Sequence, residues 1–287
     1  DLGDLARICE IAGTGYGADF VQINPLHAAE PAPPVEDSPY LPTTRRFVNP
    51  LYIRVADIAE ADRLPKKARK KLSKVAAEFA PINTSPRKLK RNKSFRCKLL
   101  WLNKIYDAGR SAEREADFTA FREREGEGLI RFATWCALAE HYGPRTDDWP
   151  DRLGKPKKLA RAIAKRADRI DFHCWLQWIC DQQLAAAGTA ATDSGMAIGV
   201  IADLAVGVNR TGADAWVLKD ALAQGVSVGA PPDGFNQQGQ DWSQPPWHPQ
   251  RLAEAGYTPY RDMLRTILRH AGGVRVDHIL GLFRLWW

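Results

Sequence analysis

The sequence predicts an α/β protein: part of a (β/α)8 TIM barrel that carries an all-helical insertion. Three short apolar runs indicate strands, at Phe20–Asn24, Ile198–Asp203 and Gly273–His278, and each follows a helical pattern and ends in polar residues. Apolar strands that alternate with helices are typical of parallel βα units. Because three clear strands are found where a complete barrel has eight, the predicted barrel is partial.

The first predicted strand ends before a proline and directs its side chains to alternate faces. Val21 and Ile23 face outward and Asn24 faces inward, because successive side chains of a strand point to opposite sides. In a barrel, residues at the carboxyl ends of strands line the catalytic face. Asn24 is therefore a candidate site residue. The run from Pro50 to Val55 is a weaker candidate for a fourth, short strand.

Residues 56–192 break the βα rhythm and are predicted to form helices. A run that carries the first of two apolar stripes ends at Gly143-Pro144. Such stripes are far more often helix–helix core than a ligand platform, so the segment is interpreted as a helical subdomain inserted between two barrel strands. The two stripes are Phe118, Phe121, Leu129, Phe132, Trp135 and Leu138, and then Ile170, Phe172, Trp175, Leu176, Trp178, Ile179 and Leu184.

The second and third predicted strands bring aspartates to the same end of the sheet. The second closes on Asp203, and in the third Arg275 and Asp277 share the face opposite two valines. An arginine beside a carboxylate favours the charged form, which a carboxylate nucleophile requires. A buried structural ion pair would give the same pattern. The shared position of Asn24, Asp203 and Asp277 at strand ends favours a common site.

The segment from Gly229 to Pro249 shows no helix or strand periodicity and is predicted to be a loop. Loops longer than about 12–15 residues are uncommon inside compact domains and are usually functional. Aromatic faces pack against the C–H faces of sugars, and amides bind hydroxyls. A proline-stiffened loop whose aromatic residues pack on the barrel is the alternative. The aromatic residues are Phe235, Trp242 and Trp247, and the amides are Asn236, Gln237, Gln238 and Gln240.

Several stretches of the chain resemble the amylomaltases, the 4-α-glucanotransferase branch of the α-amylase clan. They extend from one end of the chain to the other and together are highly specific. The resemblance implies a TIM barrel with helical subdomains on its catalytic face. The stretches are Phe20–His27 (FVQINPLH), Ser38–Tyr40 (SPY) with Arg45, Arg46 and Asn49–Ile53 (NPLYI), Asp203–Val208 (DLAVGV), Gly229–Trp242 (GAPPDGFNQQGQDW) and Gly273–Trp287 (GVRVDHILGLFRLWW).

The resemblance also implies roles for individual residues. Asp277, in the R-x-D-H motif, corresponds to the glycosyl nucleophile, and Arg275 and His278 line the same subsite. Tyr40 of the S-P-Y motif resembles a tyrosine that packs against the donor sugar. Trp242 of the G-Q-x-W loop resembles a tryptophan over which the glucan chain passes. The predicted substrate-binding residues are Tyr40, Asn24, Asp203, Trp242, Arg275 and His278.

A second catalytic carboxyl group is missing from the pattern. Retaining glycosyl transfer uses two carboxyl groups about 5–5.5 Å apart, a nucleophile and an acid/base. By resemblance, a glutamate on a later strand and a further aspartate are expected, and neither is found. The chain also opens at Asp1 without a methionine, so we expect it to be an internal part of a longer protein and inactive alone. No glutamate ends a strand-like run, as an acid/base residue would. The following glutamates lie in helical patterns: Glu10, Glu60, Glu78, Glu140 and Glu254.

The net charge of +7 comes from one segment. Residues 63–110 hold 16 Lys and Arg against Glu78 and Asp107, so the rest of the chain is net negative. An anionic partner such as RNA is one interpretation of this segment. A solvated basic helix face is the other, and it is favoured because no RNA-binding motif accompanies the charges. No nucleic-acid partner is expected.

The remaining composition is that of an ordinary soluble globular protein. No apolar run approaches the length of a membrane span, so no membrane partner is expected. The five cysteines lack paired CxxC spacing, which predicts reduced thiols in a cytoplasmic protein and no zinc. No cofactor or metal is expected, because glycosyl transfer needs neither. The cysteines are Cys9, Cys97, Cys136, Cys174 and Cys180.

These inferences predict a 4-α-glucanotransferase that moves α-1,4-glucan segments between maltooligosaccharides through a glycosyl ester of Asp277. Two alternatives stay open: an α-glucan hydrolase of the same clan, and a non-catalytic carbohydrate- or RNA-binding module. Barrel units with the S-P-Y loop are expected at residues 1–55 and the helical subdomain at 56–192. The barrel strands with the G-Q-x-W loop and the nucleophile are expected at 193–287.

Overall fold

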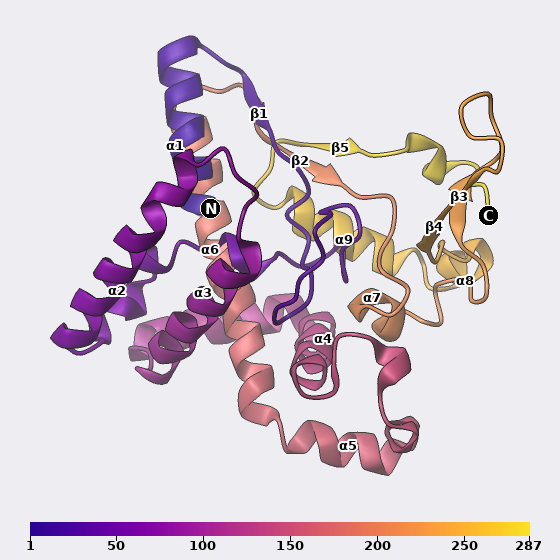
Figure 1. Cartoon of the computed structure of the whole chain (residues 1–287), viewed down its shortest axis with the longest axis horizontal. Coiled ribbons are helices and arrows are strands. Elements are labelled where there is room, and N and C mark those ends of the chain that lie inside the picture. The colour runs from indigo at the N-terminus through magenta and orange to yellow at the C-terminus, as the bar shows by residue number, and fades with distance from the viewer.

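A three-stranded parallel sheet organises the computed structural model, which describes residues 1–287 (Figure 1). The strand order is β1 (Phe20–Gln22), β2 (Gly199–Leu204), β5 (Gly273–Val276). Both pairings are parallel, and the register places Asp203 opposite Arg275. Parallel neighbours need long crossover connections, and here these connections contain helices, as in a (β/α)8 barrel. The predicted partial barrel is confirmed.

The helical insertion is also confirmed, since five helices lie between β1 and β2. Gly143, with φ of 100°, follows the last residue of α4, where the sequence predicts a helix end. Helix α9 leads directly into β5. The division into domains at residues 55 and 192 stays a prediction. The helices are α1 (Leu2–Glu10), α2 (Lys66–Phe79), α3 (Arg91–Asp107), α4 (Ala112–Tyr142), α5 (Pro156–Ala164), α6 (Ala167–Asp193), α7 (Ala213–Val217), α8 (Pro249–Glu254) and α9 (Thr258–Leu268).

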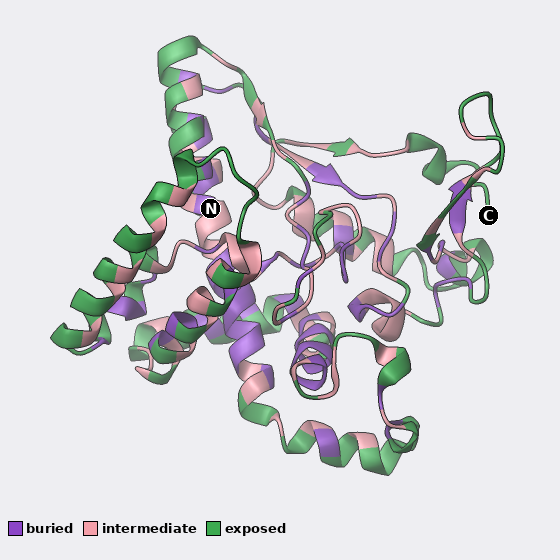
Figure 2. Ribbon diagram, in the orientation of Figure 1, coloured by how far each residue is buried: buried purple, intermediate pink, exposed green.

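The two predicted apolar stripes form the centre of the larger hydrophobic core. All six residues of the α4 stripe are buried, and every residue of the α6 stripe except the half-buried Leu184 is buried as well. Figure 2 shows this burial as purple bands on α4 and on the middle of α6. The stripes are therefore helix–helix core, as the sequence predicts, and not a ligand platform.

Helix α6 joins the helical subdomain to the sheet. Its first half belongs to the larger core, and near its end Ala187 and Ala191 pack with α1 and with Val200 of β2 in a second core. A Cβ added at Gly188 would lie 2.8 Å from the carbonyl oxygen of His270, so glycine lets the turn after α9 approach the helix. One continuous helix therefore positions both β2 and the segment that leads into β5.

The predicted fourth strand at Pro50–Val55 is wrong. Pro50–Tyr52 is a 3-10 turn, because Oδ1 of Asn49 accepts a hydrogen bond from the Leu51 N–H at 3.0 Å and starts a helical turn. In a sheet, the carbonyl oxygens of Leu51 and Ile53 would accept hydrogen bonds from a neighbouring strand. Here both accept from Lys98 Nζ, at 2.6 Å and 2.8 Å.

The segment predicted as a structureless loop contains an antiparallel pair of strands. These are β3 (Val228–Ala230) and β4 (Gln240–Gln244), and they lie beside the C-terminus in Figure 1. The sequence hides them because β4 is polar and largely exposed, so no apolar alternation marks it. Backbone pairing depends on Gly229, since a Cβ there would lie 1.8 Å from the carbonyl oxygen of Gln240.

The five cysteines are free thiols, as the sequence predicts. Four of them are buried, and burial raises the pKa of the Cys174 thiol to about 12. A thiol with a raised pKa is a poor nucleophile, so these residues act as small apolar side chains. None of the helices combines the length and the apolar character needed to span a membrane.

Candidate active site

Asp203 and Arg275 meet at the carboxyl end of the sheet. The register of β2 and β5 places them side by side, so their side chains project from the same face. Nη1 of Arg275 donates hydrogen bonds to both carboxylate oxygens of Asp203, at 2.9 and 2.8 Å. The Asp203 side chain is 2% exposed and that of Arg275 is 41% exposed. The arginine therefore covers a buried carboxylate from the solvent side.

Asp277 follows β5 directly and is much less engaged. Nη2 of Arg275 donates to Oδ1 of Asp277 at 3.1 Å, and the Asp277 side chain is 30% exposed. Its backbone N–H donates to the carbonyl oxygen of Leu204 at 3.1 Å, so the chain stays aligned with β2 just past the strand. The second carboxylate oxygen, Oδ2, accepts no hydrogen bond. Asp277 thus presents one open oxygen at the edge of the sheet.

Tyr40 reaches the same site from the S-P-Y loop. Its hydroxyl donates to Oδ2 of Asp203 at 2.7 Å, and this hydrogen bond to an acidic group raises the pKa of Tyr40. The loop is held in turn by Gln244, whose Nε2 donates to the carbonyl oxygen of Tyr40 at 3.1 Å. Asp203 therefore accepts from two side chains, and both of its oxygens are occupied.

Trp242 and His278 form an aromatic pair beside Asp277. Their rings meet edge to face, with centroids 5.1 Å apart at an interplanar angle of 88°. The indole N–H of Trp242 donates to Oε1 of Gln240 at 3.0 Å, which fixes the ring on the hairpin. His278 has a φ of 54°, so the backbone turns sharply directly after the aspartate. The hairpin thus contacts the residue that follows Asp277.

The structure places Asn24 at the same edge of the sheet but joins it to none of the other site residues. The Ile23 N–H still donates to the carbonyl oxygen of Ile201 at 3.1 Å, which keeps this segment aligned with β2. Asn24 itself is exposed and its side chain makes no hydrogen bond. Its predicted position at the strand end is therefore observed without a contact to Asp203 or Asp277.

The other two aromatic residues of the hairpin segment differ from Trp242. Phe235 is fully exposed. Trp247 packs inside, with the guanidinium of Arg45 5.4 Å from its ring centroid and the ring of Tyr260 at 6.3 Å. Trp247 therefore follows the alternative in which an aromatic residue of this segment packs against the protein. Two of the predicted amides shape the hairpin itself: Asn236 Oδ1 accepts from the Gln238 N–H, and Gln240 accepts from Trp242.

Two residues to which the sequence gives no role, His27 and Arg45, hold the chain at Ala205 and Val206, just past Asp203. Nε2 of His27 accepts a hydrogen bond from the Ala205 N–H at 3.3 Å, and Arg45 Nη1 donates to the carbonyl oxygens of Ala205 and Val206 at 3.1 and 2.6 Å. Burial, with a further effect from Arg45, lowers the pKa of His27 to about 3, so this histidine is a neutral acceptor. Both lie in stretches that carry the family resemblance, yet their spacing gives no sign of this contact.

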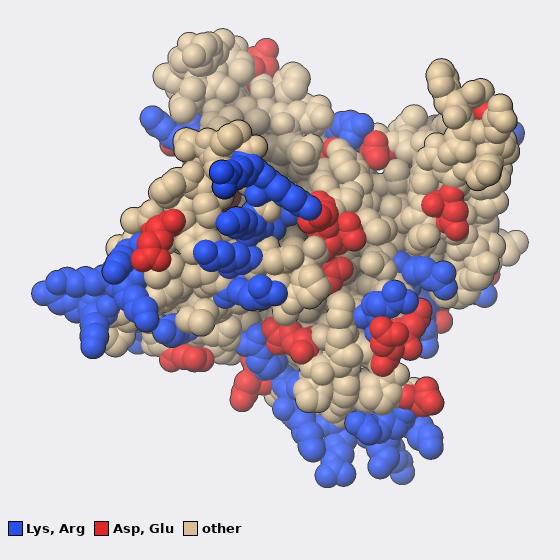
Figure 3. Space-filling view, in the orientation of Figure 1, with Lys and Arg blue, Asp and Glu red and all other residues tan.

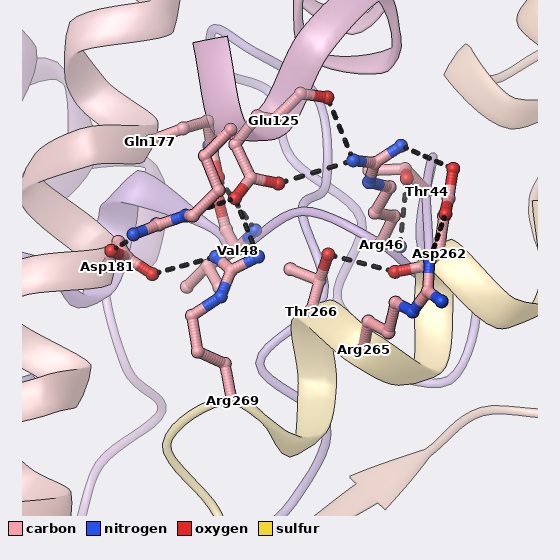
Figure 4. Close-up of polar contacts among 11 residues, drawn as sticks. Thr44, Arg46, Val48, Glu125, Gln177, Asp181, Asp262, Arg265, Thr266 and Arg269 are labelled. Carbon is pink, nitrogen blue, oxygen red and sulfur yellow. Dashed lines mark hydrogen bonds and ion pairs between the residues drawn. The ribbon is translucent and has the colours of Figure 1, made fainter. Parts of the chain in front are cut away.

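A cluster of buried charges lies between α4, α6 and α9 (Figure 4). Glu125, whose side chain is 1% exposed, lies 3.3 Å from Arg46, 3.1 Å from Arg124 and 2.6 Å from Arg269. Asp181 pairs with the same Arg124 and Arg269, at 2.7 and 3.0 Å. Burial alone would raise the pKa of Asp181, but hydrogen bonds from a histidine and the two arginines lower it far below its usual value.

The Glu125 carboxylate joins three parts of the chain. Arg46 belongs to the segment after the S-P-Y loop, and Arg269 follows the last residue of α9, just before β5. Helix α4 is broken at Gly126, where φ is 64° and ψ is −152°. A Cβ at Gly128 would lie 2.2 Å from Nη1 of Arg46, so that glycine admits the arginine. The sequence does contain one sign that Glu125 is buried. It lies four residues from both Phe121 and Leu129, on the apolar stripe of α4.

The site around Asp277 is open. The cavity lined by Asp277 and His278 has a volume of about 40 Å³, and the one lined by Asp203 has about 50 Å³. Small-molecule pockets usually measure about 300–1,000 Å³, so both cavities are smaller than such a pocket. No group of three or more His, Cys, Asp or Glu side chains is arranged to hold a metal ion.

Comparison with known proteins identifies relatives along the whole chain. A family profile described as 4-alpha-glucanotransferase matches residues 1–287. The 4-alpha-glucanotransferase of Mycobacterium tuberculosis strain H37Rv is 52% identical over 297 residues, which cover 100% of this chain and 40% of the relative. The chain therefore spans about 40% of the length of this curated relative.

Two solved structures are similar to the chain. The crystal structure of amylomaltase from Corynebacterium glutamicum matches with a TM-score of 0.89 and 54% identity, over 99% of this chain and 39% of that one. The amylomaltase from Streptococcus agalactiae in complex with acarbose matches with a TM-score of 0.80, over 99% of this chain and 56% of that one. At its 18% identity, the second likeness shows the fold alone.

Proposed function

The chain belongs to the 4-alpha-glucanotransferase family, and we propose that it carries the nucleophile side of an amylomaltase active site. In this proposal, Asp277 receives a glucan segment from an α-1,4-glucan donor and passes it to a hydroxyl of a maltooligosaccharide acceptor. Tyr40, Asn24, Trp242 and the residues beside Asp277 bind the donor sugar.

One observation carries the assignment of Asp277: it is the aspartate of the pair that keeps an open oxygen. A carboxylate nucleophile needs an unoccupied lone pair that can approach the anomeric carbon. Both oxygens of Asp203 accept hydrogen bonds from Arg275 or Tyr40, whereas Oδ2 of Asp277 accepts none. Asp203 is buried beneath the arginine, and Asp277 is half-exposed. Asp203 is therefore assigned to orienting Arg275 and Tyr40.

The proposed reaction is a retaining double displacement. Oδ2 of Asp277 forms an ester bond to the anomeric carbon as the glycosidic C–O bond breaks, and the departing oxygen takes a proton from a general acid. The acceptor hydroxyl then attacks the same carbon, gives its proton to that group and releases Asp277. Two inversions at the anomeric carbon retain the α configuration.

The general acid is not among the strand-end residues of this sheet. No glutamate of the chain lies in a strand or directly after one, and Glu30 and Glu36 lie well into the loop that follows β1. Asp203 is unsuited to the role because its oxygens already accept from Arg275 and Tyr40. We therefore assign proton transfer to a group in the part of the family's longer proteins that this chain does not span.

The neighbours of Asp277 fit the needs of a glycosyl ester. The guanidinium of Arg275 lies beside the Asp277 carboxylate and donates to its Oδ1 at 3.1 Å, which leaves Oδ2 free to attack. The edge-to-face pair of Trp242 and His278 offers an apolar wall against which a sugar ring can pack, and a bound acceptor glucan there would exclude water from the ester. Transfer to a sugar is then favoured over hydrolysis.

The free thiols support a cytoplasmic location, because unpaired buried cysteines are usual in reducing compartments. The proposed partners are α-1,4-glucans and maltooligosaccharides. The proposed chemistry requires no metal and no cofactor.

A glycosyl fluoride tests the nucleophile in the 287-residue chain itself. Fluoride departs without being protonated, so α-maltotriosyl fluoride can glycosylate Asp277 without a general acid, and the ester should then accumulate. Peptide mapping by mass spectrometry should find the maltotriosyl group on the peptide that contains Asp277, and Asp277→Asn should remain unlabelled. The same chain should not disproportionate maltotriose. Labelling at Asp203, or equal labelling of the Asp277→Asn variant, would refute the assignment.

A further inference from the structure

A larger cavity, of about 810 Å³, lies in the helical subdomain between the end of α4, helix α5 and the start of α6. It shares no residue with the site around Asp277. Its only acidic lining residue is Glu140. Figure 3 shows Lys and Arg side chains gathered over the α5 end of the molecule. The cationic lining residues are Arg152, Lys158, Arg161, Lys165, Arg166 and Arg169.

The charge of Glu140 is already matched by its neighbours. Arg169 donates to both of its carboxylate oxygens, at 2.9 and 2.6 Å, and His173 Nε2 lies 3.3 Å from Oε1. Burial alone would raise the pKa of Glu140, but the contacts with His173 and Arg169 lower it to about 2. Glu140 therefore neutralises Arg169 and leaves the other five cations unmatched.

None of those five cations forms an ion pair within the protein. Arg166 is nevertheless held in place, since Nη1 donates to the Ala162 carbonyl oxygen at 2.9 Å and the guanidinium lies 5.0 Å from the ring centroid of Tyr142. Like charges gathered around one cavity repel each other and focus a positive potential into it. A bound anion would remove that repulsion.

We propose that this cavity binds a small polyanion that carries at least two phosphate groups. The volume lies within the range of small-molecule sites. Guanidinium groups bind phosphate oxygens through paired hydrogen bonds, and lysine ammonium groups add point charges. Five unmatched cations suit a ligand with several negative charges better than a neutral glucan. The proposal does not depend on the reaction assigned to Asp277.

Calorimetric titration of the 287-residue chain at physiological ionic strength tests this site. Inorganic pyrophosphate and glucose 1,6-bisphosphate are the probes, and maltotriose is the neutral comparison. We expect saturable one-to-one binding of at least one phosphorylated probe, without competition from maltotriose. Binding of both probes points to the phosphate pair as the recognised group, and binding of the bisphosphate alone points to a sugar phosphate.

Two charge-matched variants separate the cavity from general basicity. Arg161→Gln with Lys165→Gln removes two exposed lining cations and should weaken binding at least tenfold. Lys66→Gln with Lys67→Gln removes the same charge from the exposed start of α2 and should change affinity less than twofold. Equal weakening in both variants would mean non-specific attraction and would overturn the proposal. Absence of saturable binding by either probe at millimolar concentration would overturn it as well.

Discussion

Nη1 of Arg275 bridges both carboxylate oxygens of Asp203, a residue on the neighbouring strand 72 positions earlier in the sequence. The same guanidinium makes a single hydrogen bond to Asp277, two residues further along its own strand. The two carboxylates therefore share one cation unequally. Hydrogen bonding to Asp203 and its charge raise the pKa of Arg275, so this cation persists across the whole accessible pH range.

Arg275→Ala should lower the free energy of unfolding because it leaves the buried Asp203 carboxylate without its cation. The loss should be smaller than for a fully buried pair, because water reaches the guanidinium. Urea denaturation measures the change. Arg284→Ala is the control, since Arg284 is exposed and forms no ion pair. Equal losses in the two variants would show that the contact with Asp203 does not stabilise the fold.

Asp277→Asn should abolish transfer in the enzyme completed to the length of its relatives. Asparagine keeps the shape of the side chain but lacks the charge that attacks the anomeric carbon, so kcat should fall by several orders of magnitude. Binding of a maltooligosaccharide, followed by tryptophan fluorescence, should change little because Tyr40 and Trp242 remain. A variant that retains more than a tenth of wild-type kcat would remove Asp277 from the role of nucleophile.

Trp242 and Trp247 should respond differently to substitution although both belong to the hairpin segment. In the completed enzyme, Trp242→Ala should raise the ratio of hydrolysis to transfer several-fold, because water reaches the ester more easily. Trp247→Ala should instead lower the free energy of unfolding by about 2–3 kcal/mol, since its ring packs against Arg45 and Tyr260. Product analysis by chromatography and urea denaturation measure the two effects. An unchanged product ratio in Trp242→Ala would exclude that residue from the site.

Glu125→Gln should destabilise the protein more than any substitution at an exposed acid of α4. It removes the buried anion on which Arg46, Arg124 and Arg269 converge. Asp181 still pairs with Arg124 and Arg269, and Asp262 with Arg46, so we expect a loss of about 1–3 kcal/mol. Thermal unfolding followed by circular dichroism measures the loss. Glu127→Gln, on the same helix but exposed and without an ion pair, should be close to wild type. A Glu125→Gln protein as stable as the control would contradict the role given to this cluster.

The buried His27 should make the protein less stable as the pH falls. Its pKa is 6.5 in the unfolded chain and about 3 in the folded protein, so the unfolded state binds more protons between these values. Stability is therefore full above about pH 6.5 and declines progressively toward pH 3. His27→Gln keeps an acceptor for the Ala205 N–H and should flatten this decline in urea titrations. His141→Gln, at an exposed position, should leave the slope unchanged.

Strand positions and helical stripes could be read from the sequence because both are local patterns of side-chain burial. The three parallel strands were predicted within two residues at each end, and the stripe from Phe118 to Leu138 is core. The hairpin was missed because β4 is polar and exposed, so its pairing depends on backbone contacts near Gly229 that leave no pattern. The turn at Pro50 was misjudged because an asparagine cap and a distant lysine satisfy its backbone.

The residues of the candidate site that lie at strand ends could be predicted from the sequence. The contacts between loop segments that are distant in the sequence could not. Asp203, Arg275 and Asp277 were brought together by the parallel pattern alone. The unequal sharing of Arg275 follows from strand register, which the sequence does not reveal. The contact of His27 with Ala205 joins segments far apart in the sequence, and the sequence pattern around neither residue predicts it.

Because Arg46 and Arg269 bind one carboxylate on α4, the helical insertion cannot be trimmed away to leave a minimal barrel. A redesign that deletes residues 112–142 would remove Glu125 and leave Arg269 with Asp181 alone and Arg46 with Asp262 alone. The segment that carries Tyr40 and the strand that carries Asp277 would then be joined only through the Tyr40–Asp203–Arg275 contacts and the longer Arg46–Asp262 pair. Any smaller version of this scaffold would need a replacement acid between those two arginines.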